Sequence, residues 1–266
     1  MGAYKDVQVG FGELPEANSA ISFKIIQEWL RECDNLSDHS DCRLAKKGYY
    51  TSRESLPTMP TRVIDVGSTQ NNKVRLYPTV AGSKGDWIAL SHPWGDGPSF
   101  VTTRDNLEAH LAGIDFDEMP ATFRDAVTVT RALGHRYLWI DSLCIIQGSG
   151  GDLDQEYKNM EDVYSGAYCV IAASRSTSHH SGFLKGRPNR QVVALRPSKA
   201  APNSRLYISE MTDNFQAHVL DGALNRRAWV MQEHALARRT IFFAEHQIYW
   251  ECGRGVRCET MISMTK

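Results

Sequence analysis

Two short apolar runs of the sequence each end in side chains that can bind a ligand. Residues 137–147 read YLWIDSLCIIQ, and residues 87–95 read WIALSHPWG. Such runs predict buried strands, and in a parallel α/β sheet the loops beyond the carboxyl ends of the strands form the ligand site. We expect eight residues to line this rim: Ser91, His92, Trp94, Gly95, Asp141, Ser142, Cys144 and Gln147. The alternative for Asp141 is that its carboxylate accepts backbone N–H bonds at a turn.

A glycine-rich turn and a glutamate follow the apolar run at 137–147. QGSGGD at 147–152 lies between a predicted strand and a predicted helix, where glycines let backbone amides approach a phosphate. It lacks the full GxGxxG pattern and the P-loop lysine, so a flexible turn competes with this interpretation. On the next helix Glu156, Met160 and Tyr164 share a face, and Glu156 lies in the first turn. Its carboxylate can act as a base, although a first-turn glutamate is also favoured by the helix dipole.

The segment RRAWVMQE carries a third group of polar side chains. On a helix Arg226, Trp229 and Glu233 align on one face, with Gln232 and Arg227 beside them. An exposed group around a tryptophan would form a polar wall for a ligand, with Glu233 as a candidate catalytic carboxylate. A buried arginine–glutamate pair would instead stabilise the fold. Spacing alone leaves both possibilities open.

The cysteines and remaining histidines give weaker signals. A metal-binding set can be assembled from five residues: Cys33, His39, Cys42, Cys252 and Cys258. Their spacing does not match the usual CxxC knuckles, so we expect ordinary buried thiols, a surface histidine at His39 and no metal. His179 and His180 lie in a serine-rich loop and are expected in solvent.

The elements that position these residues follow from hydrophobic periodicity. Helices are predicted at 19–33, 121–134, 153–165 and 223–236, and strands at 62–66, 73–78, 87–91, 137–146, 168–174 and 240–252, the last as a hairpin. Alternating strands and helices predict an α/β fold with a mostly parallel, Rossmann-like or flavodoxin-like sheet. Residues 1–80 are expected to form an N-terminal helix, loop and hairpin cap, and residues 81–260 the core of one integrated domain.

Composition excludes several classes of function. The 266 residues include 30 Lys and Arg against 31 Asp and Glu, which gives no general attraction to nucleic acid. The apolar runs are too short to span a bilayer and the N-terminus lacks a signal peptide, so we expect a cytoplasmic protein. GxSxG, HExxH, P-loop and kinase motifs are absent from the sequence, so ordinary hydrolase chemistry is unsupported.

The three groups of residues, in this order, resemble the fungal heterokaryon incompatibility (HET) domain. The resemblance runs from about Trp29 to Glu259 through IALSHPWG, TFRDAVTVTRALGHRYLWIDSLCIIQ, MEDVYSGAYCVIAAS, RRAWVMQE and YWEC. Where members carry Ser-Tyr-Cys-Trp-Gly, this chain has His92 and Pro93 in place of Tyr and Cys. The Asp-Trp that usually opens the middle helix is Asp152 and Leu153 here, and an Arg-Gly-Trp step has Ala228 in place of Gly.

The resemblance implies an effector domain of fungal self/non-self recognition that triggers programmed cell death. It also implies self-association or a partner recognition protein. The family has been likened to TIR domains, some of which cleave NAD, so NAD is the candidate substrate and no cofactor is required. In that hypothesis the rim binds the nucleotide and a glutamate, Glu156 in preference to Glu233, stabilises the ribose cation. The competing hypothesis is a non-enzymatic signalling module in which the same motifs form a buried polar network.

Overall fold

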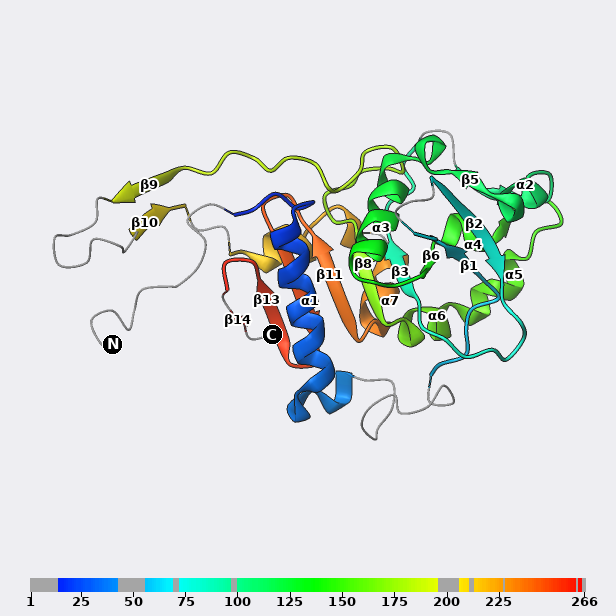
Figure 1. Ribbon diagram of the computed structural model, residues 1–266, viewed down its shortest axis with the longest axis horizontal. Coiled ribbons are helices and arrows are strands. Elements are labelled where there is room, and N and C mark those ends of the chain that lie inside the picture. Colours follow the sequence, from blue (N-terminus) through cyan, green and yellow to red (C-terminus); the bar gives the residue numbers. More distant parts are fainter. Residues whose placement is uncertain are drawn as a thin grey trace.

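The computed structural model describes most of the chain. The described residues are 14–42, 56–68, 72–96, 100–195, 206–210, 213–226, 228–261 and 263–264. Its main sheet has ten strands in the order β14-β13-β12-β11-β8-β3-β6-β1-β2-β5 (Figure 1). Their bounds are β1 (Arg62–Asp65), β2 (Lys73–Pro78), β3 (Ile88–Ser91), β5 (Ile114–Asp115), β6 (Tyr137–Trp139), β8 (Cys169–Ala172), β11 (Arg239–Phe243), β12 (Ile248–Cys252), β13 (Gly255–Cys258) and β14 (Ser263–Met264).

The pairing of the strands corrects the expected topology. Strands β6, β3, β8 and β11 pair in parallel, whereas the other six pairings of the described sheet are antiparallel. The prediction of an α/β fold is confirmed, but the prediction of a mostly parallel, flavodoxin-like sheet is wrong. Part of the reason is that β11, β12, β13 and β14 follow one another through short connections. Only Gly253 and Arg254 separate β12 from β13, and such a turn allows only antiparallel pairing.

Seven α-helices accompany the sheet in the described ranges. They are α1 (Ala20–Asn35), α2 (Leu107–Ala112), α3 (Ala121–Ala132), α4 (Asp141–Cys144), α5 (Leu153–Glu156), α6 (Met160–Gly166) and α7 (Ala228–Leu236). Shorter helical turns are η1 (Ser37–Cys42), η3 (Phe116–Glu118), η4 (Tyr157–Asn159), η5 (Gln216–Leu220) and η6 (Leu224–Arg226). None of the helices in these ranges has the length and apolar character needed to cross a membrane.

Helix α1 confirms the periodicity of its sequence. Ser19 caps its N-terminus by accepting a hydrogen bond from the Ser22 amide over 3.2 Å. The buried face consists of Ser22, Ile25, Ile26, Trp29, Leu30 and Cys33, as the spacing predicts. The helix contacts β12 and lies over the β11–β13 end of the sheet, while β1 and β2 extend the opposite end (Figure 1).

Two predicted elements are shorter than the sequence indicates. The run 137–146 forms only three residues of strand, β6, before the chain turns into α4 at Asp141. The predicted helix 153–165 is divided into α5, η4 and α6. In contrast, α3 runs unbroken from Ala121 to Ala132, and Gly134, two residues beyond its end, has a φ of +81° that suits a helix stop.

The core packs on both sides of the central strands. Its largest fully buried side chains are Trp87, Trp139, Trp250, Tyr164, Tyr249, Phe123, Phe183, Phe242, Phe243, Ile26, Ile64 and Leu76. Strands β3 and β8 are buried along their whole length, as expected for strands covered on both faces. A small parallel pair, β4 (Thr102–Thr103) with β7 (Ile146–Gln147), lies beside α4.

A separate two-stranded sheet lies apart from the main body. Strands β9 (Val192–Leu195) and β10 (Leu206–Ser209) pair antiparallel and project away from the ten-stranded sheet (Figure 1). Because Val193 pairs with Ile208, these two side chains share a face with Leu195. Val193, Leu195 and Ile208 are 59%, 38% and 60% exposed, so the described residues leave this apolar face open to solvent.

Candidate functional site

Three motifs are numbered in chain order: the first is residues 87–95, the second is 137–147 and the third is 226–233. The first and second motifs meet at the carboxyl edge of β3 and β6. These strands are parallel neighbours, with Ala89 opposite Trp139, so the residues that follow them emerge at the same edge. Trp94 Nε1 donates a hydrogen bond to Asp141 Oδ2 over 2.8 Å. The other carboxylate oxygen, Oδ1, accepts the Ser142 amide over 2.6 Å. Asp141 therefore bonds the backbone of the first turn of α4 and anchors the indole of the first motif.

A layer of aromatic rings lies behind this contact. The His179 ring centre lies 4.9 Å from Phe123, 5.0 Å from His92 and 5.6 Å from Trp94. His92 Nδ1 also lies 3.8 Å from Asp141 Oδ1. His180 is exposed, as expected, but the prediction that His179 is solvated is wrong. Its ring is buried because the serine-rich loop folds back onto α3.

Polar bonds hold this serine-rich loop against α3. Thr122 Oγ1 lies 2.9 Å from Ser176 Oγ, and the Thr122 amide donates to the His179 carbonyl over 2.9 Å. Asp125 Oδ2 accepts the amides of Phe183 and Leu184 over 2.6 and 2.9 Å. The loop that follows β8 is thus fixed beside the first motif.

Gly95 serves the packing of the same loop. Its φ is +76°, and a Cβ at this position would lie 2.4 Å from Ser178 Cβ. Both the backbone conformation and the close approach require glycine. Ser91, which ends β3, is buried, and its carbonyl accepts the Ala173 amide over 2.9 Å.

Cys144 and Gln147 take local roles. Cys144 is buried, and burial raises the pKa of its thiol to about 12. A thiol that stays protonated at neutral pH is a poor nucleophile. Gln147 is half-buried and its Nε2 donates to the Ile145 carbonyl over 3.2 Å.

Glu156 lies in a polar cluster that joins α5 to the start of β1. Thr61 Oγ1 donates to Glu156 Oε1 over 2.8 Å. Beside it Arg62 donates from Nε to the Cys144 carbonyl over 2.7 Å and forms an ion pair with Asp152 over 2.5 Å. Asp152 also accepts the Ile146 amide over 2.8 Å. The buried Glu156 carboxylate and its neighbours therefore tie β1 to the α4–α5 connection.

The sequence pattern misses Thr61 and Arg62. They come from the N-terminal hairpin, and their roles depend on the antiparallel pairing of β1 with β6. The only signal available is a polar pair at the start of an apolar strand, a position that is usually solvated.

The glycine-rich turn at 147–152 is held by a hydrogen bond within the turn and by one from Arg104. Gly148 and Gly150 have φ values of +81° and +70°. The Gly151 amide donates to the Gly148 carbonyl over 3.1 Å, and Arg104 donates to the Gly150 carbonyl over 2.7 Å. The turn thus has the geometry of a tight loop that requires glycine.

The third motif is described only in part. Glu233 is buried on α7, which contacts α6, and Arg226 at the end of η6 is exposed. Arg227 lies outside the described residues. Trp229 and Gln232 lie on α7, but their side chains are also outside the described set. The structure therefore joins Trp94 to Asp141 directly and places Glu156 and Glu233 on separate helices.

Two buried hydroxyl groups belong to the same rim. Within the described part of the chain, Ser91 Oγ and Ser142 Oγ have no hydrogen-bond partner. Ser91 ends β3, and Ser142 follows Asp141. Buried polar atoms usually have a partner, so these two oxygens are available to a polar group that enters the rim.

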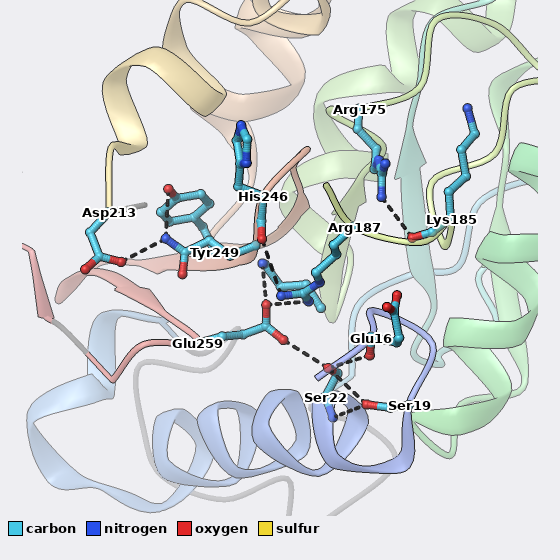
Figure 2. A network of polar contacts seen from close by, with 12 residues as sticks. Glu16, Ser19, Ser22, Arg175, Lys185, Arg187, Asp213, His246, Tyr249 and Glu259 are labelled. Carbon is cyan, nitrogen blue, oxygen red and sulfur yellow. Dashed lines mark hydrogen bonds and ion pairs between the residues drawn. The ribbon is translucent and has the colours of Figure 1, made fainter. Parts of the chain in front are cut away.

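A second buried network links the two ends of the chain. The fully buried Glu259 carboxylate accepts Ser22 Oγ over 3.0 Å, Arg187 over 2.6 Å and the Ile248 amide over 2.7 Å (Figure 2). Burial raises the pKa of Glu259, although Arg187 and the Ile248 amide oppose this shift. Residue spacing does not predict this role for Glu259, because Ser22 and Arg187 lie 237 and 72 residues away in the chain. The network fastens α1 to β12.

The cysteine and histidine candidates separate into two places. Cys33, His39, Cys42 and Cys252 come together, and their metal-binding atoms all lie within 4.8 Å of one another. Cys258 lies elsewhere, with its Sγ 3.4 Å from Asp213 Oδ1 and 3.0 Å from Thr260 Oγ1.

Comparison with known proteins agrees with the order of the motifs. Residues 87–233 match the family model described as heterokaryon incompatibility protein (HET). This stretch is more than half of the 266 residues and runs from β3 to Glu233 on α7. No curated protein and no solved structure matches the chain.

Proposed function

Because the chain belongs to the heterokaryon incompatibility protein (HET) family, we propose that it is a cell-death effector that signals by contact between protein chains. Family membership implies a role in fungal heterokaryon incompatibility. The proposal adds the mode of action: the motifs stabilise the domain, and an exposed apolar surface makes the signalling contact. The observation that carries it is the uncovered face of the β9–β10 sheet.

The bonding of the motif residues supports a structural role for them. Trp94 and Asp141 bond one another, and Glu156 accepts a bond from Thr61. The Cys144 thiol is buried and protonated at neutral pH. Polar groups that bond each other inside a protein are costly to break, since each substitution leaves a partner unsatisfied. Loss of such a residue silences a domain by unfolding it, without any role in chemistry.

The β9–β10 sheet offers the contact surface. Isolated two-stranded sheets are marginally stable in water and need a further layer or strand. Val193, Leu195 and Ile208 form an apolar face on this sheet that the described chain leaves open. Large apolar side chains grouped on one exposed face are typical of protein-binding surfaces.

A second copy of this chain is the occupant that we assign to this face. Two such sheets related by a twofold axis bury the same three side chains against each other. Each supplies the layer that the other lacks, and the projection of the sheet from the main body leaves room for a second copy (Figure 1). Self-association then couples two effector domains.

The test measures assembly and cell death together. Light scattering across a concentration series should show a dimer or larger species for the wild-type chain. Ile208→Asp places a charge in the contact and should weaken association by about tenfold or more. The same variant should lose growth arrest in a fungal host. A chain that stays monomeric and still arrests growth would remove this proposal.

A second candidate function is cleavage of the nicotinamide bond of NAD. The observation that favours it is the pair of buried hydroxyls, Ser91 Oγ and Ser142 Oγ, beside Asp141. In this candidate the rim holds the ribose and Glu156 stabilises the ribose cation. Chromatography of NAD incubated with the purified chain tests it. Nicotinamide release that is lost in Glu156→Gln at an unchanged melting temperature would support it, and intact NAD with assembled protein would exclude it.

A further inference from the structure

Three cysteines and one histidine from three elements converge in the interior. Cys33 lies on α1, His39 and Cys42 on η1, and Cys252 at the end of β12. All four are buried, so the expectation that His39 lies on the surface is wrong. Their metal-binding atoms lie within 4.8 Å of one another, although His39 and Cys252 are 213 residues apart in the sequence. These residues lie outside the 87–233 segment that matches the family model.

The distances fit a tetrahedral metal site. With Zn–S bonds of about 2.3 Å and Zn–N bonds of about 2.0–2.1 Å, tetrahedral geometry separates sulfur from nitrogen by about 3.6 Å. His39 Nδ1 lies 3.7 Å from Cys42 Sγ and 3.6 Å from Cys252 Sγ. All six cysteines of the chain are free thiols in this structure. Three thiolates and one imidazole are a donor set that zinc prefers.

The surroundings of the cluster suit bound thiolates. The Arg254 amide points to Cys252 Sγ over 3.5 Å. At Gly253 a Cβ would lie 3.3 Å from Cys42 Sγ, so glycine lets the turn after β12 approach this sulfur closely. Arg239 is buried beside the cluster, and its Nε donates to the Cys42 carbonyl over 3.2 Å. Its Nη1 forms an ion pair with Asp34 over 2.7 Å, so the backbone of η1 beside Cys42 is tied through Arg239 to α1 as well as to β11.

We propose that Cys33, His39, Cys42 and Cys252 bind a structural zinc ion that fastens the N-terminal helical segment to β12. This revises the expectation of ordinary thiols drawn from spacing alone. A site with four protein ligands is closed, so the ion has no open position for a substrate and contributes to folding. Because it joins segments far apart in the chain, its removal should loosen η1 and the C-terminal end of α1 from β12.

Metal content of the full-length chain, purified with a tag that contains no histidine, tests the proposal. Inductively coupled plasma mass spectrometry should find about one zinc ion per chain in the wild type and less than about a tenth of that in Cys252→Ala. Cys144→Ala is the matched control, because it truncates a buried free thiol on α4 and should keep the zinc.

A second measurement uses the wild-type chain alone, in case Cys252→Ala does not fold. A chelator should lower the melting temperature, and added zinc should restore it. Replacement by cobalt should give thiolate-to-cobalt charge-transfer bands. A zinc-free chain that shows none of these responses, or peptide mapping that finds two of the three cysteines in a disulfide, would overturn the proposal. Equal loss of zinc in Cys144→Ala and Cys252→Ala would also contradict it.

Discussion

The indole of Trp94 donates a hydrogen bond to Asp141 over 2.8 Å, which joins the loop after β3 to the first turn of α4. Asp141→Asn leaves one oxygen to accept both the indole and the Ser142 amide. We expect it to lower the free energy of unfolding by about 1–3 kcal/mol. Denaturant titration measures this loss.

A double-mutant cycle with Trp94→Phe isolates the bond itself. The coupling free energy between the two substitutions should be about 0.5–1.5 kcal/mol. Additive effects within experimental error would show that the two side chains do not support one another.

Replacement of Asp65 should change the response of the protein to acid. Burial raises the pKa of Asp65, but hydrogen bonds from Arg136, the Gly67 amide and Arg75 outweigh it and hold the pKa below its usual value. A lowered folded-state pKa stabilises the protein above the unfolded pKa of about 3.9. That stability is lost as the pH falls through the folded-state value.

Asp65→Asn removes this dependence. We expect a lower free energy of unfolding at neutral pH, by about 1–3 kcal/mol, and a smaller loss between neutral pH and about pH 3. Thermal unfolding across this pH range measures both effects. An acid profile with the wild-type slope would contradict the assigned role of Asp65.

Substitution of Glu259 tests the network that joins the two ends of the chain (Figure 2). Glu259→Gln keeps the shape but removes the charge that faces Arg187, which leaves a buried guanidinium without its counterion. We expect a destabilisation of about 3–5 kcal/mol. Hydrogen exchange should show the earliest loss of protection in α1 and β12. Unchanged protection of these two elements would show that Glu259 does not hold α1 against β12.

Growth arrest should survive substitutions at Glu156 that preserve the fold. Glu156→Gln keeps an oxygen that can accept the Thr61 hydroxyl, so its destabilisation should be below about 1.5 kcal/mol. If the chain acts by assembly, a fungal host that expresses Glu156→Gln at wild-type abundance should still show growth arrest. Loss of arrest at an unchanged melting temperature would instead favour chemistry at Glu156.

Local periodicity predicted the elements but not their pairing. The buried faces of α1 and α3 follow from residue spacing, since a helix repeats every 3.6 residues whatever it packs against. Strand direction depends on distant partners, so an apolar run such as β6 does not reveal that β1 lies antiparallel beside it.

In the candidate site, too, local sequence does not reveal contacts that depend on distant segments. Trp94 and Asp141 were predicted to share a rim because parallel neighbours end at one edge, and their contact agrees with this. The polar sequence of its loop predicts a solvated His179, and only the packing of that loop on α3 buries it. Cys252 joins Cys33, His39 and Cys42 through the fold of the whole chain, which no spacing rule describes.

Growth arrest by a double variant of the β9–β10 sheet tests the central claim most directly. Val193→Asp and Ile208→Asp together place charges on the exposed apolar face, while Val80→Asp places one at a position that is 73% exposed and distant in sequence. At matched abundance and melting temperature, the double variant should be monomeric and unable to arrest growth, and Val80→Asp should behave as wild type. Full growth arrest by the double variant would contradict signalling through this face.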